Sequence, residues 1–333
     1  MKTKFSILTT FLFLFLGIGW WLTFNLVRSN LDHIAETPNQ PDIFMTNVTY
    51  WKMDPVTGLA THQLTTSKIT HHPLDDEYDL TAPEATILSS EKQLWKIQAN
   101  YGKSKQNQII IDLSGNVNIQ QFSDLIAKNP SLSIATEALT FYPEKQYAET
   151  KQPLLITQPN SAVKAVGGNM DFKENILQLS SMVEGQYTPE KKTGETSPQP
   201  AMYKANQAKC QEKNNLCIYT GDVKFNQGTS AMDAPNILVY RDNSNIIQKI
   251  LATGTPAHYQ TINDQTKKPL NATAQKIEIF PLQNLMTLTG TAEIDEEQNK
   301  FTSDYIKYDI KKQTIMSLPN PNSLTTIFLP PQP

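Results

Sequence analysis

The sequence predicts an all-β protein after one N-terminal transmembrane helix, and two observations carry the fold class. First, polar and apolar side chains alternate with period two in many short runs, as in "QKIEIFP" (275–281) and "DYIKYDI" (304–310). Side chains two apart point to the same face of a strand, so each run has one apolar face. Second, no window after residue 28 keeps the apolar spacing of an amphipathic helix over three turns. A sandwich, a jelly roll or a β-solenoid is therefore expected.

A glycine recurs in the same phase of three of these strands. The stretches are "LSGNVNIQQ" (113–121), "YTGDVKFNQ" (219–227) and "LTGTAEIDE" (288–296). Their spread along the chain indicates repeated, related units. The direct physical role predicted for the glycines is to form bulges or bends that curve a sheet.

The predicted transmembrane helix comprises residues 5–27, which contain no charged side chain. At about 1.5 Å per residue this segment is long enough to cross a hydrocarbon core of about 30 Å. Lys2 and Lys4 precede it, so the positive-inside rule places residues 1–4 in the cytoplasm and the rest of the chain outside it. A cleaved signal peptide is the alternative, but the apolar run is long and no A-x-A pattern follows it.

Polar, proline-containing segments divide the remainder. Residues 28–42 are predicted to be a tether and residues 189–200 a proline-rich linker, which leaves strand-rich domains at 43–188 and 201–330. With 29 basic and 32 acidic residues, the net charge of -3 gives no reason to expect nucleic-acid binding.

The two cysteines, Cys210 and Cys217, flank a segment that could form a hairpin turn, so their side chains could face each other across two strands. A disulfide is plausible in an oxidising compartment, and two free thiols remain the alternative.

The sequence contains no recognisable catalytic or cofactor-binding motif: no G-x-S-x-G elbow, P-loop or G-x-G-x-x-G is found. The histidines lack metal-site spacing and are expected to be solvated loop residues; they are His33, His62, His71, His72 and His258. The acidic residues fall mainly on outward phases or in turns, where they are poorly placed for paired-carboxylate catalysis. We therefore expect a binding or scaffolding protein with no enzymatic activity, no metal and no cofactor.

Several motifs of the chain resemble those of two related families. Residues 5–188 resemble LptC, the membrane-anchored periplasmic component of lipopolysaccharide export, through "DPVTGLATHQLTTSKI", "LWKIQANYGK", "LSGNVNIQQ" and "IATEALTFYPEKQYAETKQPLLI" in the family's order. Residues 201–330 resemble LptA, the soluble bridge protein, through "GDVKFNQGTSAMDAPNILVY", "ATGTPAHYQT" and "LNATAQKIEIFPLQNLMTLTG". The usual member of either family is a single domain, so this chain resembles a fusion of the two.

The resemblance implies two open, twisted β-jelly rolls of the OstA type, whose stacked strands enclose an apolar groove for lipopolysaccharide acyl chains. Alternation and resemblance together assign the following residues to that groove: Ile109, Ile111, Leu113, Val117, Ile119, Phe141, Tyr203, Val223, Phe225, Ile237, Val239, Tyr259, Ile277, Ile279 and Leu288. Gly58 corresponds to a glycine expected where the anchored family meets its transporter.

The resemblance also implies partners and a location. The chain would sit in the inner membrane by one span, with both domains in the periplasm. It would accept lipopolysaccharide from an LptB/LptF/LptG-like ABC transporter and pass it toward an LptD-like outer-membrane translocon or further LptA-like units. The alternative is an anchored periplasmic scaffold whose apolar faces form a closed core without lipid. Small residues, namely Ala231, Ala234, Ala252 and Ala292, argue mildly for free space, although they also permit close packing.

Overall fold

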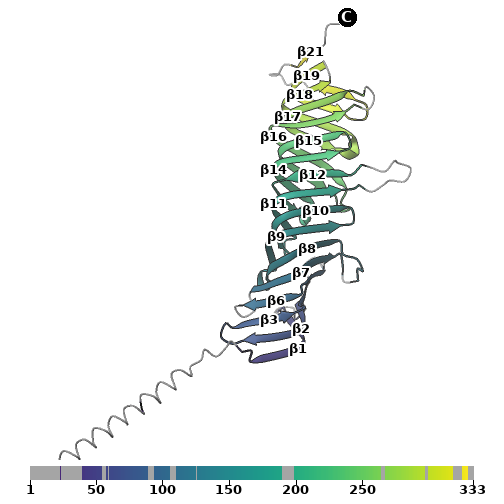
Figure 1. The fold of residues 1–333 in the computed structure, drawn as a ribbon. Helices are drawn as coiled ribbons and strands as arrows, with labels where there is room; N and C mark the ends of the chain where they lie inside the picture. The colour runs from purple at the N-terminus through teal and green to yellow at the C-terminus, as the bar shows by residue number, and fades with distance from the viewer. Residues whose placement is uncertain are drawn as a thin grey trace, which may run out of the picture.

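The computed structural model describes residue 23 and residues 40–54, 58, 60–88, 94–105, 110–124, 126–189, 199–263, 267–296, 299–317 and 325–328. Within these residues all 21 strands belong to one antiparallel sheet, which confirms the all-β prediction. The strands stack like rungs along one axis, from β1 near the start of the chain to β21 near its end (Figure 1).

The bounds of the strands follow chain order. The first eleven are β1 (Ile43–Met53), β2 (Ala60–His72), β3 (Glu77–Thr81), β4 (Glu84–Leu88), β5 (Leu94–Gln98), β6 (Tyr101–Lys105), β7 (Ile110–Phe122), β8 (Leu132–Tyr142), β9 (Tyr147–Gln158), β10 (Ser161–Asp171) and β11 (Ile176–Tyr187). The others are β12 (Ala201–Ala205), β13 (Gln207–Gln211), β14 (Leu216–Gln227), β15 (Ser230–Arg241), β16 (Ile247–Ile262), β17 (Pro269–Phe280), β18 (Leu285–Glu296), β19 (Asn299–Asp309), β20 (Thr314–Ser317) and β21 (Thr326–Phe328). Short 3-10 turns are η1 (Pro143–Lys145), η2 (Glu212–Asn214) and η3 (Pro281–Gln283).

The predicted membrane anchor, residues 5–27, lies outside the described residues apart from residue 23, as do the cytoplasmic tip and most of the tether. In the part of the chain that the structure describes, no helix has the length and apolar character needed to cross a membrane.

Each level of the stack is one strand that bends in the middle. Several levels are split at the bend into two short strands: β5 and β6 both pair with β7, and β12 and β13 both pair with β14. The long strands bend too, because their pairing registers shift at mid-strand. The bend divides the sheet into two halves that face each other. Half-sheet 1 contains β3, β6, β13 and β20, half-sheet 2 contains β4, β5, β12 and β21, and each long strand contributes to both.

The three in-phase glycines lie at these bends. Gly115, Gly221 and Gly290 have φ of 75°, 80° and 78°, a left-handed conformation that glycine adopts without a Cβ penalty. The register shifts fall at the same places, between Ser114 and Val117, for example. The predicted bending role of the glycines is therefore confirmed.

The bends also leave no room for a side chain. A Cβ on Gly221 would meet the side chain of Asn206 at 2.6–2.9 Å, and one on Gly290 would meet Gln275 at 2.5–3.1 Å. Asn206 lies between β12 and β13, and its backbone N–H donates to the Gly221 carbonyl. The corner is thus a repeated unit in which a glycine on one level packs against an amide side chain on the level before it.

The two predicted domains are joined by sheet pairing. On β11, the last strand before the predicted linker, Gly185 pairs with Tyr203 of β12 and Leu177 pairs with Cys210 of β13. The hydrogen-bonded ladder therefore continues from the first predicted domain into the second (Figure 1), although residues 190–198 between them lie outside the described part of the chain.

Candidate functional site

The predicted groove residues lie on the inner face of the bent sheet. Ile109 is outside the described residues. The buried ones are Ile111, Leu113, Val117, Ile119, Phe141, Val223, Ile237, Tyr259, Ile277 and Leu288. Those that are half-buried are Tyr203, Phe225, Val239 and Ile279. The buried apolar side chains of both domains form one continuous cluster, so the apolar inner face runs the length of the stack.

This interior is closely packed. Ile277 and Leu288 pair with each other across β17 and β18, and both are 0% exposed. Ala234, Ala252 and Ala292 are also buried. The two facing half-sheets enclose a wedge-shaped interior that narrows toward the bends. Small residues at the bends thus fill its narrow part, where larger side chains would not fit. The mild argument for free space from these alanines therefore does not hold.

Residues far apart in the chain meet across the wedge because the two half-sheets face each other. The Trp95 ring of half-sheet 2 packs edge-on against Phe172, with ring centroids 5.1 Å apart. Gln121 Nε2 donates to Glu212 Oε2 at 2.9 Å, and Lys52 pairs with Glu144 of η1. The last two contacts join the free ends of the half-sheets, where the apolar interior meets water. Sequence patterning did not predict them, since alternation gives the face of a residue and not what lies opposite.

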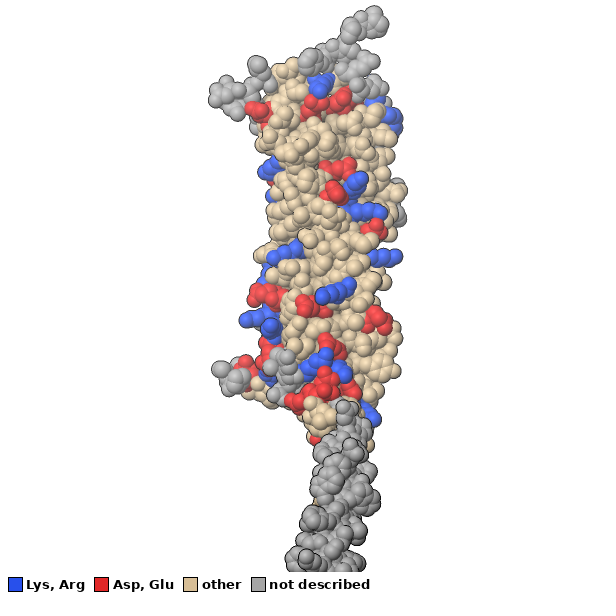
Figure 2. Space-filling view, turned by 60° about the vertical axis from the view of Figure 1, so that its left-hand side comes forward, with Lys and Arg blue, Asp and Glu red and all other residues tan. Residues whose placement is uncertain are grey.

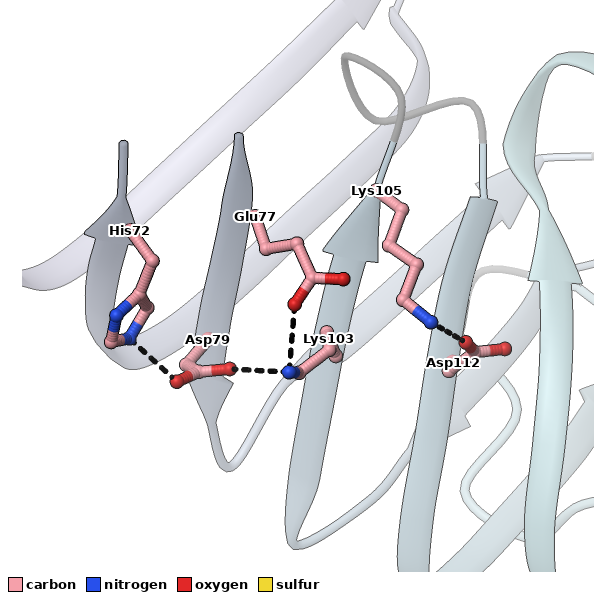
Figure 3. Close-up of polar contacts among 6 residues, drawn as sticks. All are labelled: His72, Glu77, Asp79, Lys103, Lys105 and Asp112. Atoms are coloured by element: carbon pink, nitrogen blue, oxygen red, sulfur yellow. Dashed lines mark hydrogen bonds and ion pairs between the residues drawn. The ribbon is translucent and has the colours of Figure 1, made fainter. Parts of the chain in front are cut away.

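The outer face carries charged side chains that pair across neighbouring strands. Figure 3 shows one such ladder on half-sheet 1, where Lys103 Nζ lies 2.8 Å from Glu77 Oε2 and His72 Nε2 lies 2.9 Å from Asp79 Oδ2. The hydrogen bond from Lys103 is the main cause that lowers the pKa of Glu77. On the face shown in Figure 2, acidic and basic side chains are interspersed along the molecule. These carboxylates pair with bases on neighbouring strands, and the described residues contain no cluster of ligands suited to a metal ion.

The expectation that the histidines are solvated loop residues is wrong for those in the described residues. His62, His71 and His72 lie in β2, and His258 lies in β16; His33 is outside the described residues. His71 is buried, with its ring 4.4 Å from that of Tyr78. Its Nδ1 lies 2.6 Å from Asp42 Oδ1 and its Nε2 lies 3.2 Å from Asp76 Oδ1. The inward-facing His71 therefore lies between two carboxylates, which its sequence pattern did not indicate.

His71 should make the start of the stack sensitive to pH. The hydrogen bond to Asp42 is the main cause that raises the pKa of His71 above 6.5, and Asp76 adds to it. Because the folded-state pKa is raised, this stabilisation is fully present below pH 6.5 and is lost as the pH rises through the folded-state value. We expect NMR titration to give a raised pKa for His71, and the unfolding temperature of the wild type to fall over that range more than that of His71→Gln. An equal pH dependence in both proteins would contradict this assignment.

The junction between the domains holds a polar cluster inside the apolar interior. Tyr203 lies across Gly185, where a Cβ would meet its ring, and its ring centroid is 5.1 Å from that of Tyr219 on half-sheet 1. Burial raises the pKa of Tyr219 well above its ordinary value. Burial also raises the pKa of Tyr203, and hydrogen bonds with Tyr219 and Ser161 partly oppose that shift.

A disulfide joins Cys210 and Cys217 beside this cluster. The two residues are direct cross-strand partners on β13 and β14, with Cα atoms 4.1 Å apart. Arg241, at the end of β15, donates from Nη2 to Cys217 Sγ at 3.6 Å. Tyr219 and Arg241 were not among the residues assigned from the sequence.

The first strand presents an unusual number of exposed apolar side chains. Phe44, Tyr50, Trp51 and Met53 of β1 are each about half exposed or more. β1 pairs with β2 on one side, and the described residues place no strand on its other side. Gly58, just after β1, is exposed and has a φ of 67°. At the other end of the stack, β20 and β21 both pair with β19.

Comparison with known proteins matches both halves of the chain to families. Residues 9–188, more than half of the chain, match the family described as "Lipopolysaccharide-assembly, LptC-related". Residues 204–314 match the family described as "LptA/(LptD N-terminal domain) LPS transport protein".

Individual relatives include lipopolysaccharide export proteins of the LptA type. The lipopolysaccharide export system protein LptH of Pseudomonas aeruginosa is 27% identical over 117 residues, covering 35% of this chain and 67% of that protein. LptA of Escherichia coli K12 is 26% identical over 170 residues, covering 49% of this chain and 91% of that protein. The crystal structure of LptH aligns with a TM-score of 0.37 and 24% identity over 40% of this chain and 96% of LptH, which is too low to support a structural conclusion. The chain belongs to the LptC-related lipopolysaccharide-assembly family and carries an LptA-like domain in the same polypeptide.

Proposed function

We propose that this protein is a non-enzymatic conduit that binds lipopolysaccharide by its acyl chains and passes it along the inner face of the bent sheet. The observation that carries the proposal is the continuous apolar interior, which crosses the junction between the LptC-like and LptA-like domains through the pairing of β11 with β12 and β13. A lipid could therefore move from one domain to the other without leaving an apolar surface.

The energetics favour such a surface. Exposing one CH₂ group to water costs about 0.8 kcal/mol, so an acyl chain of about a dozen carbons would meet a barrier of about 10 kcal/mol in an aqueous gap. Moving an acyl chain between a bilayer and an apolar groove changes its free energy much less, because both surroundings are apolar. The protein then needs no chemistry of its own, and the direction of transport comes from ATP hydrolysis by an inner-membrane transporter.

The groove requires the half-sheets to separate, because the inner side chains are packed together in the described structure. Among the described residues, contacts between the free ends of the half-sheets are a few polar ones, such as the part-buried hydrogen bond of Gln121 with Glu212, and a hydrogen bond to a charged group contributes only about 1.5–3 kcal/mol. Separation there would expose the apolar inner face to acyl chains while the sugars stay in water.

The location and partners follow from the same proposal. Residues 5–27 would anchor the chain in the inner membrane by one span, with residues 1–4 in the cytoplasm and both domains in the periplasm. β1, with its exposed apolar side chains, and Gly58 would dock on an LptB/LptF/LptG-like transporter by adding a strand to its sheet. The edge formed by β20 and β21 would meet an LptD-like translocon or a further LptA-like unit.

The reach of the molecule fits a bridge made of several parts. The 21 strands form 17 levels, because four pairs of short strands share a level each. At about 4.8 Å per level the stack advances roughly 80 Å. This is about twice what one domain supplies and leaves a role for an outer-membrane partner's own strands.

Photo-crosslinking in intact cells would test the conduit. A photoreactive amino acid would replace Ile111 or Phe225 on the inner face, and Lys224, which is exposed on the outer face, would serve as the control. Lipopolysaccharide adducts at both inner positions, dependent on ATP hydrolysis and missing at Lys224, are expected. Adducts at Ile111 alone would make the second domain a docking module.

A closed scaffold without lipid is the second candidate, and the 0% exposure of Ile277 and Leu288 favours it. It predicts no adduct at either inner position in a folded, correctly anchored protein. That result would exclude the conduit.

A further inference from the structure

Arg241 is a cation at the inner edge of the apolar interior, with no anionic partner in the described part of the chain. The chain has two arginines, Arg28 and Arg241, and the first lies outside the described residues. Arg241 ends β15 two positions after Val239, so alternation places both on the inner face of half-sheet 1. Among the described residues, no carboxylate forms an ion pair with it.

The guanidinium is only partly satisfied. Nη1 donates to Asn245 Oδ1 at 3.2 Å and Nη2 donates to Cys217 Sγ, a weak acceptor, at 3.6 Å. Nε is buried and has no hydrogen-bond partner. A buried donor on a charged group is costly to leave unpaired, so this arrangement calls for an acceptor that the described residues do not supply.

The surroundings indicate where that acceptor would sit. Arg241 lies close enough to Tyr203 and Tyr219 for its charge to oppose the rise in the pKa of both hydroxyls. Ser161, on half-sheet 2 like Tyr203, lies close enough for its hydroxyl to lower the pKa of Tyr203. The guanidinium, the two phenols and the serine hydroxyl therefore form a polar spot at the junction, next to the apolar side chains of Ile237 and Val239.

The chemistry of the group narrows the ligand. A guanidinium presents a planar fork of donors that matches the oxygens of a phosphate, with charge-assisted hydrogen bonds about twice as strong as neutral ones. A phosphate carried on an acylated headgroup would reach this fork while its acyl chains lie on the inner face below. Neighbouring hydroxyls could donate to the remaining phosphate oxygens.

We infer that Arg241 is a specificity-determining residue that binds a phosphate on the headgroup of the transported lipid as it crosses the junction. This inference rests on the proposed conduit function. The conduit requires only acyl chains, whereas the Arg241 site distinguishes lipids by their phosphate, so the two can fail separately.

The test compares two lipid probes on the full-length protein in detergent: lipid A with both phosphates and the same lipid after enzymatic removal of the phosphates. The wild type should bind the phosphorylated probe about tenfold or more tightly than the other, since one lost charge-assisted contact corresponds to about that factor. Arg241→Gln should lose this preference and bind the dephosphorylated probe as the wild type does. Arg241→Lys, which keeps the charge, should recover part of it, and Lys224→Gln on the outer face should change nothing.

Each other outcome overturns the inference. If Arg241→Gln lowered the affinity for both probes equally, the Arg241 side chain would act by packing against the disulfide. If Arg241→Gln kept the wild-type preference for the phosphorylated probe, another group would bind the phosphate. An Arg241-dependent rise in unfolding temperature with inorganic phosphate alone, together with no preference between the probes, would assign the site to the free ion. If the wild type bound neither probe, both the proposed conduit and the Arg241 site would be excluded. If the wild type bound both probes equally, only the Arg241 site would be excluded.

Discussion

Gln186→Pro is expected to lower the free energy of unfolding by about 2 kcal/mol or more and to open the stack between β10 and β11, just before the LptA-like domain. Gln186 lies in β11, between Ala162 of β10 and Met202 of β12. The backbone N–H of Thr188 donates to Asn160, next to β10, and that of Gln186, two positions earlier, therefore points to β10 as well. Proline at 186 removes this ladder hydrogen bond and clashes with the pairing of β11 with β10. The side chain of Gln186 is exposed, and the effect therefore reports on the backbone alone.

Chemical denaturation and hydrogen exchange would measure this effect, with Gln186→Ala as the matched control. The alanine variant should stay within about 0.5 kcal/mol of the wild type, as exposed substitutions usually do. In the proline variant, amide protection should be lost first on β10 and β11. In cells, lipopolysaccharide adducts should persist at Ile111 and disappear at Phe225. If both variants behaved alike, the pairing of β10 with β11 would not exist in solution.

Leu288→Ala is expected to lower the free energy of unfolding by about 3 kcal/mol, because it leaves a cavity in a closely packed interior. Leu288 is 0% exposed and pairs with Ile277 on β17 and Ile306 on β19. Thr289→Ala, the next residue on the exposed face, is the matched control and should change stability by no more than about 0.5 kcal/mol. Thermal and denaturant unfolding would measure both.

The same variant separates the two candidate functions. If the interior binds acyl chains, added lipid A should raise the unfolding temperature of wild type and Leu288→Ala alike, since a ligand that binds only the folded state stabilises it. A closed core predicts the loss of stability with no response to lipid in either protein. A loss much smaller than 2 kcal/mol would show that the half-sheets are already apart around Leu288 in solution.

Strand alternation predicted the inner face well because a strand has a strict period of two. Once Val223 and Ile237 were assigned inward, the positions two apart followed, and every assigned groove residue that the structure describes lies on that face. The bending glycines were predictable for a similar local reason. A left-handed backbone conformation at Gly115, Gly221 and Gly290 excludes most other residues, so the bend is visible in the sequence itself.

Contacts across the wedge were not predictable in this way. His71 and its neighbour were expected in a loop, because their pattern does not reveal Asp42 and Asp76 nearby. Arg241 follows a clear strand, yet its position beside Cys217, Tyr203 and Tyr219 depends on how far the half-sheets are offset. The proline-rich segment at 189–200 marked a boundary between domains but did not reveal how they are arranged, and the structure shows that β11 continues the ladder into β12 and β13.

The sequence by itself determined the strand class, the inward and outward faces, the bends and the two family resemblances, because each depends on backbone preferences or spacing within a few residues. Only the tertiary structure decided that the two domains form one sheet, that the interior is closely packed, and that a guanidinium whose Nε has no partner among the described residues lies at the junction. These features depend on which levels meet across the wedge, and that is set by the twist and offset accumulated over many strands, which no local stretch of sequence records.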